Sequence, residues 1–203
     1  MKKEYLLAPG PTPVPPEALS VMGKPIFHHR TGRYRKIFQE VSQNLKIVFQ
    51  TKNDVLTFSA SGTGAMEASV VNVLSPGDTA IVVNSGKFGE RWGGLCKAYG
   101  VKVQEIKIPY GSPVEPGQIE KLLKADTAGA IKAVFTTLCE TSTGVVADIK
   151  AIGAIVRNTS AVLVVDAISG LGADDLQTDA WGVDLAVTGS QKGLMIPPGL
   201  GFV

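Results

Sequence analysis

The chain has 203 residues, of which 44% are hydrophobic and 19% charged, so it can bury a core in one domain and is not a disordered tail, a disulfide miniprotein or a coiled coil. Twenty Lys and Arg against 18 Asp and Glu leave a net charge of +2 without basic runs, which argues against a nucleic-acid partner. With no signal-peptide pattern and no stretch near the ~20 apolar residues of a membrane span, we expect a soluble, cytoplasmic protein.

The N-terminal part predicts an arm and a helix. Residues 8–16 (APGPTPVPP) contain five prolines, which fix φ and remove backbone donors, so residues 1–20 are expected to form an extended arm and residues 21–203 one domain. From residue 34 to residue 49 the apolar side chains recur at helical spacing, which predicts an amphipathic helix with one buried stripe.

The rest of the chain alternates between strand and helix signals. Several strand-like runs, such as AIVV and AVLVVD, are apolar without alternation, as expected for strands covered by helices on both faces. The order predicts an α/β fold, a three-layer sandwich with a mostly parallel central sheet. The expected strands are 54–59, 79–84, 101–108, 131–137, 162–166 and 184–188, the expected helices are 65–74, 88–99, 118–124 and 149–157, and 199–203 resemble the start of another strand.

Ligands of such sheets bind beyond the carboxyl ends of the strands, so the loops there are the candidate site. Residues 59–64 (SASGTG) precede an expected helix and are either an anion cradle or a plain helix cap. Phe88 lies in a glycine-flanked turn, where its ring either begins a buried helix or stacks on a planar ligand. The loop around Thr141 is rich in hydroxyl groups, which a turn would also explain.

Two charged residues complete the set. Asp166 ends an apolar strand, where a carboxylate stays ionised only if a cation or donor faces it. Lys192 stands between a strand-like run and an apolar segment, and a lysine desolvated in such a place becomes a nucleophile and base, although a surface lysine is the plain alternative. Cys96 and Cys139 lack metal-ligand spacing, and we expect no metal site.

Three kinds of site compete for these loops. A P-loop hydrolase requires G-x-x-x-x-G-K-[ST], which is absent. A dinucleotide site would use Gly62 and Gly64, but Glu67 stands at the third glycine position and Asn84 where the ribose-binding acid belongs. A pyridoxal phosphate site needs phosphate donors, a flat face, an anion for the ring nitrogen and an amine, and the loops offer all four.

The sequence resembles the class V aminotransferases of pyridoxal phosphate fold type I, most closely the alanine:glyoxylate, serine:glyoxylate and serine:pyruvate group. The motifs that carry the resemblance are PGPT near the N-terminus, SGTG, VNVLSPGD, the Asp that ends the apolar strand, SQK and PPG. They extend over almost the whole chain and occur in the family's order.

This resemblance implies roles for individual residues. Ser61, Gly62 and Thr63 would hold the cofactor phosphate together with Gln191.

The ring of the cofactor has its own expected contacts. Phe88 would stack on the pyridine ring, and Thr141 and Ile168 would contact the cofactor. Asp166 would pair with the ring nitrogen, and Lys192 would bond covalently to the cofactor and carry the α-proton during catalysis.

The implied reaction is transfer of an amino group from a small amino acid, alanine or serine, to glyoxylate or pyruvate, in a homodimer. One alternative is an inactive fragment of a pyridoxal phosphate domain that only self-associates, through the arm and helix 34–49. A lyase of the same fold is another, but desulfurase relatives carry histidines where this chain has Phe88 and Gln191.

The resemblance also implies that family members continue well beyond residue 203. We expect the chain to be an incomplete large domain that lacks a C-terminal small domain and an arginine that grips the substrate carboxylate. Arg30, which follows two histidines, is either an entrance residue or a solvated arginine at a helix start. We therefore expect residues 1–203 alone to bind the cofactor weakly or fold poorly.

Overall fold

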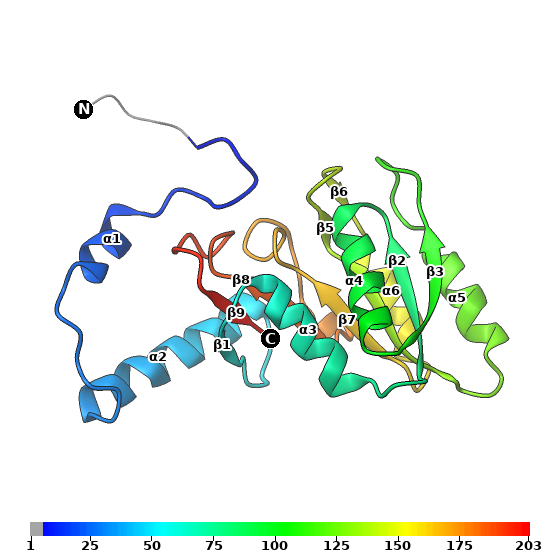
Figure 1. Ribbon diagram of the computed structural model, residues 1–203, viewed down its shortest axis with the longest axis horizontal. Helices are drawn as coiled ribbons and strands as arrows, with labels where there is room; N and C mark the ends of the chain where they lie inside the picture. The colour runs from blue at the N-terminus through cyan, green and yellow to red at the C-terminus, as the bar shows by residue number, and fades with distance from the viewer. Residues whose placement is uncertain (1–5) are drawn as a thin grey trace.

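The computed structural model describes residues 6–203 as a seven-stranded sheet with helices on both sides (Figure 1). The strand order is β1-β9-β8-β7-β4-β2-β3; β8, β7, β4, β2 and β3 are parallel, whereas β9 runs antiparallel to both of its neighbours, β1 and β8. The helices are α1 (Pro16–Met22), α2 (Gly32–Phe49), α3 (Gly62–Val73), α4 (Lys87–Ala98), α5 (Pro116–Ala125), α6 (Ile149–Val156) and α7 (Thr178–Trp181). The strands are β1 (Thr57–Ser59), β2 (Thr79–Asn84), β3 (Lys102–Lys107), β4 (Ile131–Thr137), β5 (Cys139–Glu140), β6 (Val145–Val146), β7 (Val162–Asp166), β8 (Leu185–Gly189) and β9 (Leu200–Phe202).

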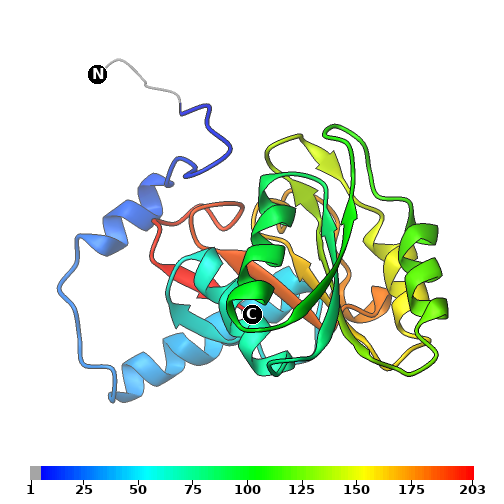
Figure 2. The ribbon, with the colours of Figure 1, turned by 45° about the vertical axis from the view of Figure 1, so that its right-hand side comes forward.

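Successive residues of the central strands enter two different cores, which is why those strands are apolar without alternation. In β2, Ile81 and Val83 pack into the core under α5 and α6, while Ala80 and Val82 pack into the core under α3 and α4. Figure 2 shows α4 on one side of the sheet and α5 and α6 on the other. The expected three-layer α/β sandwich with a mostly parallel sheet is confirmed.

Three expected strands, 79–84, 131–137 and 162–166, have the predicted bounds, and the other expected elements differ at their ends. The first strand is three residues long rather than six. The hairpin of β5 and β6 and the one-turn helix α7 were not predicted, because elements of two to four residues are too short to show a period.

The expected arm is extended only in part. A helix, α1, begins at Pro16, whereas an extended conformation is expected to residue 20. Proline is compatible with the first helical position because an N–H there would have no partner within the helix. The negative charge of Glu17 in the first turn interacts favourably with the helix dipole. Residues 1–5 of the expected arm lie outside the described residues.

The apolar stripe of α2 is mostly exposed, contrary to the prediction of a buried stripe. Figure 1 shows α1 and the first half of α2 lying away from the sheet, so only the end of α2 reaches the core. Leu45 and Phe49 are buried there. The exposed members of the stripe are Tyr34, Ile37, Phe38, Val41 and Val48, each between 38% and 50% exposed.

Among the residues that the structure describes, no helix has the length and hydrophobicity needed to cross a membrane.

Candidate active site

The carboxyl ends of β4, β7 and β8 form one edge of the sheet. The register pairs Thr137 with Asp166 and Asp166 with Val187, so the loops that follow these three strands start side by side. Helix α3 contacts both β8 and β9, which brings its N-terminus to the same edge. The predicted site residues lie at the end of β7, in the loops after β5, β7 and β8, or at the starts of α3 and α4.

The N-terminus of α3 offers free backbone donors. Ser61 is the N-cap residue, and its side chain makes no capping hydrogen bond, so the first N–H groups of the helix are available to a ligand. Gly62 lies against Ile168, where an added Cβ would come within 2.6 Å of Ile168 Cδ1. This close approach explains why a glycine starts the helix and places Ile168 beside the N-terminus of α3.

Gln191 lies next to this N-terminus. A Cβ on Gly189 would be 3.3 Å from Gln191 Oε1 and 3.4 Å from Gly62 N. The Gln191 carboxamide and the start of α3 therefore both lie against Gly189. Gln191 Oε1 is buried and has no hydrogen-bond partner among the described residues. A buried amide oxygen without a partner indicates a position where a hydrogen-bond donor fits.

Asp166 is almost fully buried, with 2% of its surface exposed, and its Oδ1 accepts a 2.8 Å hydrogen bond from Ile168 N. Burial raises the pKa of its carboxyl group to about 7, and the negative charge of Glu140 adds to this rise. The hydrogen bond from Ile168 N and the positive charges of Arg91 and Lys192 lower the pKa and so oppose the rise. The positive charge of Lys192 therefore stabilises the ionised form of the Asp166 carboxyl group. A further cation beside this group would stabilise the ionised form more.

Lys192 is half-buried, and its Nζ donates a 3.3 Å hydrogen bond to the carbonyl oxygen of Pro9. The neighbouring Gly10 leaves room for the lysine methylenes, because a Cβ there would lie 2.5 Å from Lys192 Cδ. Thr12 fixes the same contact: its N–H donates to Gln191 O at 3.0 Å and its hydroxyl to Lys192 O at 3.0 Å. The PGPT segment thus lies on the lysine loop, a contact that the sequence did not predict.

Phe88 is half-buried at the start of α4 and is linked to α3 by Arg91. The guanidinium of Arg91 lies 4.9 Å from the centre of the Phe88 ring and donates a 3.0 Å hydrogen bond to Thr63 Oγ1. The sequence assigned Arg91 no role. Its position three residues after Phe88, on the same helix face, is the signal that could have indicated it.

Thr141 donates a 2.8 Å hydrogen bond to Ser169 Oγ, which in turn donates to the carbonyl oxygen of Cys139 at 2.8 Å. This chain of bonds joins the loop after β5 to the loop after β7. Thr141 therefore lies near the end of the strand that carries Asp166, as expected for a residue of the same site.

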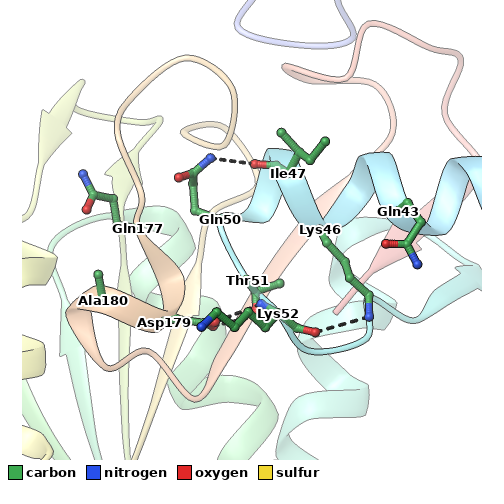
Figure 3. A pocket seen from close by; sticks show the side chains of 9 residues that line it. All are labelled: Gln43, Lys46, Ile47, Gln50, Thr51, Lys52, Gln177, Asp179 and Ala180. Atoms are coloured by element: carbon green, nitrogen blue, oxygen red, sulfur yellow. Dashed lines mark hydrogen bonds between the residues drawn. The ribbon is translucent and has the colours of Figure 1, made fainter.

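A separate cavity lies away from these residues. It has a volume of about 670 Å³ and lies between the end of α2 and α7, which precedes β8 and is therefore at the amino end of that strand (Figure 3). Its carboxylate, Asp179, already accepts hydrogen bonds from Thr51 Oγ1 at 2.6 Å and Lys52 N at 2.9 Å. This cavity contains none of the predicted site residues.

The described residues contain no group of three or more His, Cys, Asp or Glu that could hold a metal ion. Cys96 is buried and Cys139 partly buried, and neither is in a disulfide.

The residues at the carboxyl edge fit pyridoxal phosphate. The open N-terminus of α3 suits a phosphate, and Asp166 suits a protonated ring nitrogen. Lys192 supplies a primary amine close enough to Asp166 to lower the pKa of its carboxyl group. Phe88 brings an aromatic ring to the same region through Arg91.

Known proteins are similar to this chain in sequence and fold. A subunit described as "Soluble hydrogenase 42 kDa subunit" of Anabaena cylindrica is 48% identical over 99% of this chain and 53% of its own length. The serine–glyoxylate aminotransferase of Hyphomicrobium methylovorum is 37% identical over 98% of this chain and 50% of its own length. The crystal structure of an alanine–glyoxylate aminotransferase from Nostoc sp. superimposes with a TM-score of 0.91 at 31% identity, covering 100% of this chain and 55% of that one.

The chain therefore spans about half the length of the curated relatives it matches. Residues 4–203 match the family described as Aminotransferase class-V. Since this match covers nearly the whole sequence, the chain belongs to the class V aminotransferase family.

Proposed function

We propose that this protein binds pyridoxal phosphate through Lys192 and transfers an amino group between a small amino acid and a 2-oxo acid. The observation that carries the proposal is the convergence, at one edge of the sheet, of the Lys192 amine, the buried Asp166 carboxyl and the open N-terminus of α3. These groups are far apart in sequence, and each has a partner in the chemistry of one cofactor.

The phosphate would bind to backbone N–H groups at the start of α3, with the hydroxyl groups of Ser61 and Thr63. Gly62 permits this approach because it has no side chain. Gln191, whose side chain lies near Gly62 N, would donate to the same phosphate through its Nε2.

Asp166 would face the pyridine nitrogen. When bound, pyridoxal phosphate supplies an electron sink for the substrate α-carbon, and the sink is strongest with the ring nitrogen protonated. A buried carboxyl whose pKa is raised to about 7 ionises readily beside a cation, so Asp166 would hold the proton on the ring nitrogen.

Lys192 would bond to the cofactor and, once the substrate amine replaces it, its free Nζ would take the α-proton and return it to the cofactor carbon. The Pro9 carbonyl, which now accepts a hydrogen bond from Nζ, would hold the free amine at the site. Phe88 would stack on one ring face, with Thr141 and Ile168 as further cofactor contacts.

Alanine or serine as donor and glyoxylate or pyruvate as acceptor are the substrates we propose. The names of the Hyphomicrobium and Nostoc proteins support serine, alanine and glyoxylate.

The test is to titrate the purified protein with pyridoxal phosphate and follow the visible absorbance of the lysine–cofactor bond. We expect a band that Lys192→Ala removes and Lys87→Ala, a surface lysine paired with Glu90, retains. Addition of alanine or serine should discharge the band, and glyoxylate should restore it.

Other outcomes separate the alternatives. A band that no amino acid discharges indicates an inactive cofactor domain. Release of sulfide or ammonia without glyoxylate dependence indicates a lyase. A band that survives in Lys192→Ala overturns the proposal.

We also infer that the protein forms a homodimer through the apolar stripe of α2. Ile37 and Val41 are each 43% exposed on a helix that lies away from the sheet, and Ile26 just before it is 98% exposed. An apolar stripe of this kind indicates an interaction surface. Sedimentation should show a dimer that Ile37→Glu dissociates and Gln39→Glu, on the polar side of α2, preserves; an Ile37→Glu dimer of unchanged stability would contradict this.

A further inference from the structure

Glu140 is a second buried carboxylate beside the candidate site, and no role has been assigned to it so far. It is 1% exposed, at the end of β5, and makes no ion pair among the described residues. A buried charge of this kind is costly unless hydrogen bonds satisfy it.

Those hydrogen bonds come from the first turn of α4 and from Ser142. Glu140 Oε2 accepts from Phe88 N at 3.1 Å and from Gly89 N at 2.9 Å. Oε1 accepts from Phe88 N at 3.3 Å, from Ser142 N at 3.1 Å and from Ser142 Oγ at 2.7 Å. The carboxylate therefore joins the loop that carries Thr141 to the helix that carries Phe88.

Glu140 takes the place of an ordinary helix cap. The N-cap residue of α4 is Gly86, which has no side chain to cap the helix. A Cβ on Gly86 would lie 2.5 Å from Glu140 Cγ and Cδ, so the glycine is what admits the carboxylate. An anion at a helix N-terminus is favoured both by the free N–H groups and by the helix dipole.

A second bond strengthens the link. The hydroxyl of Ser142, which donates to Glu140, accepts a 3.1 Å hydrogen bond from Lys87 N. Three successive N–H groups of α4, those of Lys87, Phe88 and Gly89, are thus held by Glu140 and Ser142.

We propose that Glu140 is a positioning residue that fixes the first turn of α4 and thereby holds the Phe88 ring in place to stack on the cofactor. This inference rests on the proposed function, since it takes Phe88 as the stacking residue. Aromatic stacking depends on the offset and angle of the two rings, so a small movement of the Phe88 backbone weakens it.

The test measures the dissociation constant of pyridoxal phosphate and the circular dichroism of the bound cofactor. Glu140→Gln keeps the shape of the side chain but places an amide NH₂ against backbone donors, and we expect binding to weaken roughly tenfold with a reduced cofactor signal. Glu90→Gln is the matched control, because it removes an exposed carboxylate from the same helix turn. It should change neither quantity.

A double-mutant cycle tests whether Glu140 acts through Phe88. In a Phe88→Leu background, Glu140→Gln should weaken binding by less than about twofold further, because the ring that it positions is gone. A full tenfold loss in that background, or a Glu140→Gln protein indistinguishable from Glu90→Gln, overturns the proposal.

Hydrogen exchange separates failure of this inference from failure of the proposed function. In Glu140→Gln the Phe88 and Gly89 amides should exchange faster than in Glu90→Gln, with or without cofactor. Unchanged exchange overturns the positioning role, whereas faster exchange in a protein that binds no pyridoxal phosphate overturns the proposed function alone. If Glu140→Gln does not fold, Ser142→Ala, which removes one bond to Glu140 and the bond to Lys87 N, is measured by the same criteria.

Discussion

The side chain of Lys192 lies directly on Gly10, so that a Cβ on this glycine would come within 2.5 Å of Lys192 Cδ and 2.6 Å of Cε. The N-terminal segment and the lysine loop are thus in contact although more than 180 residues separate them, as the Pro9 bond to Lys192 also shows. Gly10 also has a φ of +153°, a backbone conformation that residues with a side chain rarely adopt.

Gly10→Ala should therefore displace Lys192 and slow the formation of its bond to pyridoxal phosphate tenfold or more. A tenfold slower rate corresponds to an activation free energy that is higher by about 1.4 kcal/mol. The lysine chain is flexible, so global stability should change little. Stopped-flow absorbance measures the rate. Gly111→Ala is the control, since Gly111 also has a positive φ but has no atom within 4 Å of an added Cβ; equal rates in the two variants would contradict the contact.

Asp166→Asn should alter how stability depends on pH in the cofactor-free protein. Burial raises the pKa of the Asp166 carboxyl to about 7, whereas an unfolded aspartate titrates near 3.9. Between these values the folded state holds a proton that the unfolded state has lost, so the free energy of unfolding falls as pH rises through this window.

The asparagine does not titrate, so this fall should be absent from the variant. Urea unfolding at pH 5 and pH 8 should show the variant gaining about 2 to 3 kcal/mol on the wild type over this interval. A constant difference between the two proteins would mean that Asp166 is ionised in the folded state throughout.

Two glycines in helices should respond oppositely to alanine. A Cβ on Gly153 in α6 would collide with the carbonyl oxygen of Trp181, so Gly153→Ala should destabilise the protein by about 1–3 kcal/mol. Gly94 in α4 has no atom within 4 Å of an added Cβ, and Gly94→Ala should stabilise by up to about 1 kcal/mol. Urea unfolding measures both, and a Gly153→Ala protein at least as stable as the wild type would contradict the contact between α6 and Trp181.

The sequence predicted the sheet well because its signal is local. Strands such as β7 are short apolar runs that end in a polar residue, and their side chains enter the two cores in turn. Such a run can be recognised from its own residues, without information about distant parts of the chain. The prediction for α2 was wrong for a related reason. A stripe of apolar residues shows that a helix has an apolar face but does not say whether this chain covers it.

The contacts of the site are less accessible to sequence reasoning. Asp166 and Lys192 were identified because each is a charged residue next to an apolar run. The contacts of Glu140 with Phe88 and of Gly10 with Lys192 join segments 52 and 182 residues apart, respectively, and only the fold brings them together. Arg91 is an intermediate case, since its helical spacing from Phe88 was visible but its bond to Thr63 was not.

The most direct test of the central claim is to incubate the purified protein with pyridoxal phosphate, reduce it with borohydride and map the modified lysine by mass spectrometry. Reduction makes the lysine–cofactor bond permanent, so the map reports which amine the cofactor reached. The account predicts modification at Lys192, lost when the start of α3 is altered by Gly62→Val. Modification spread over surface lysines such as Lys87 and Lys124, with Lys192 unmodified, would contradict it.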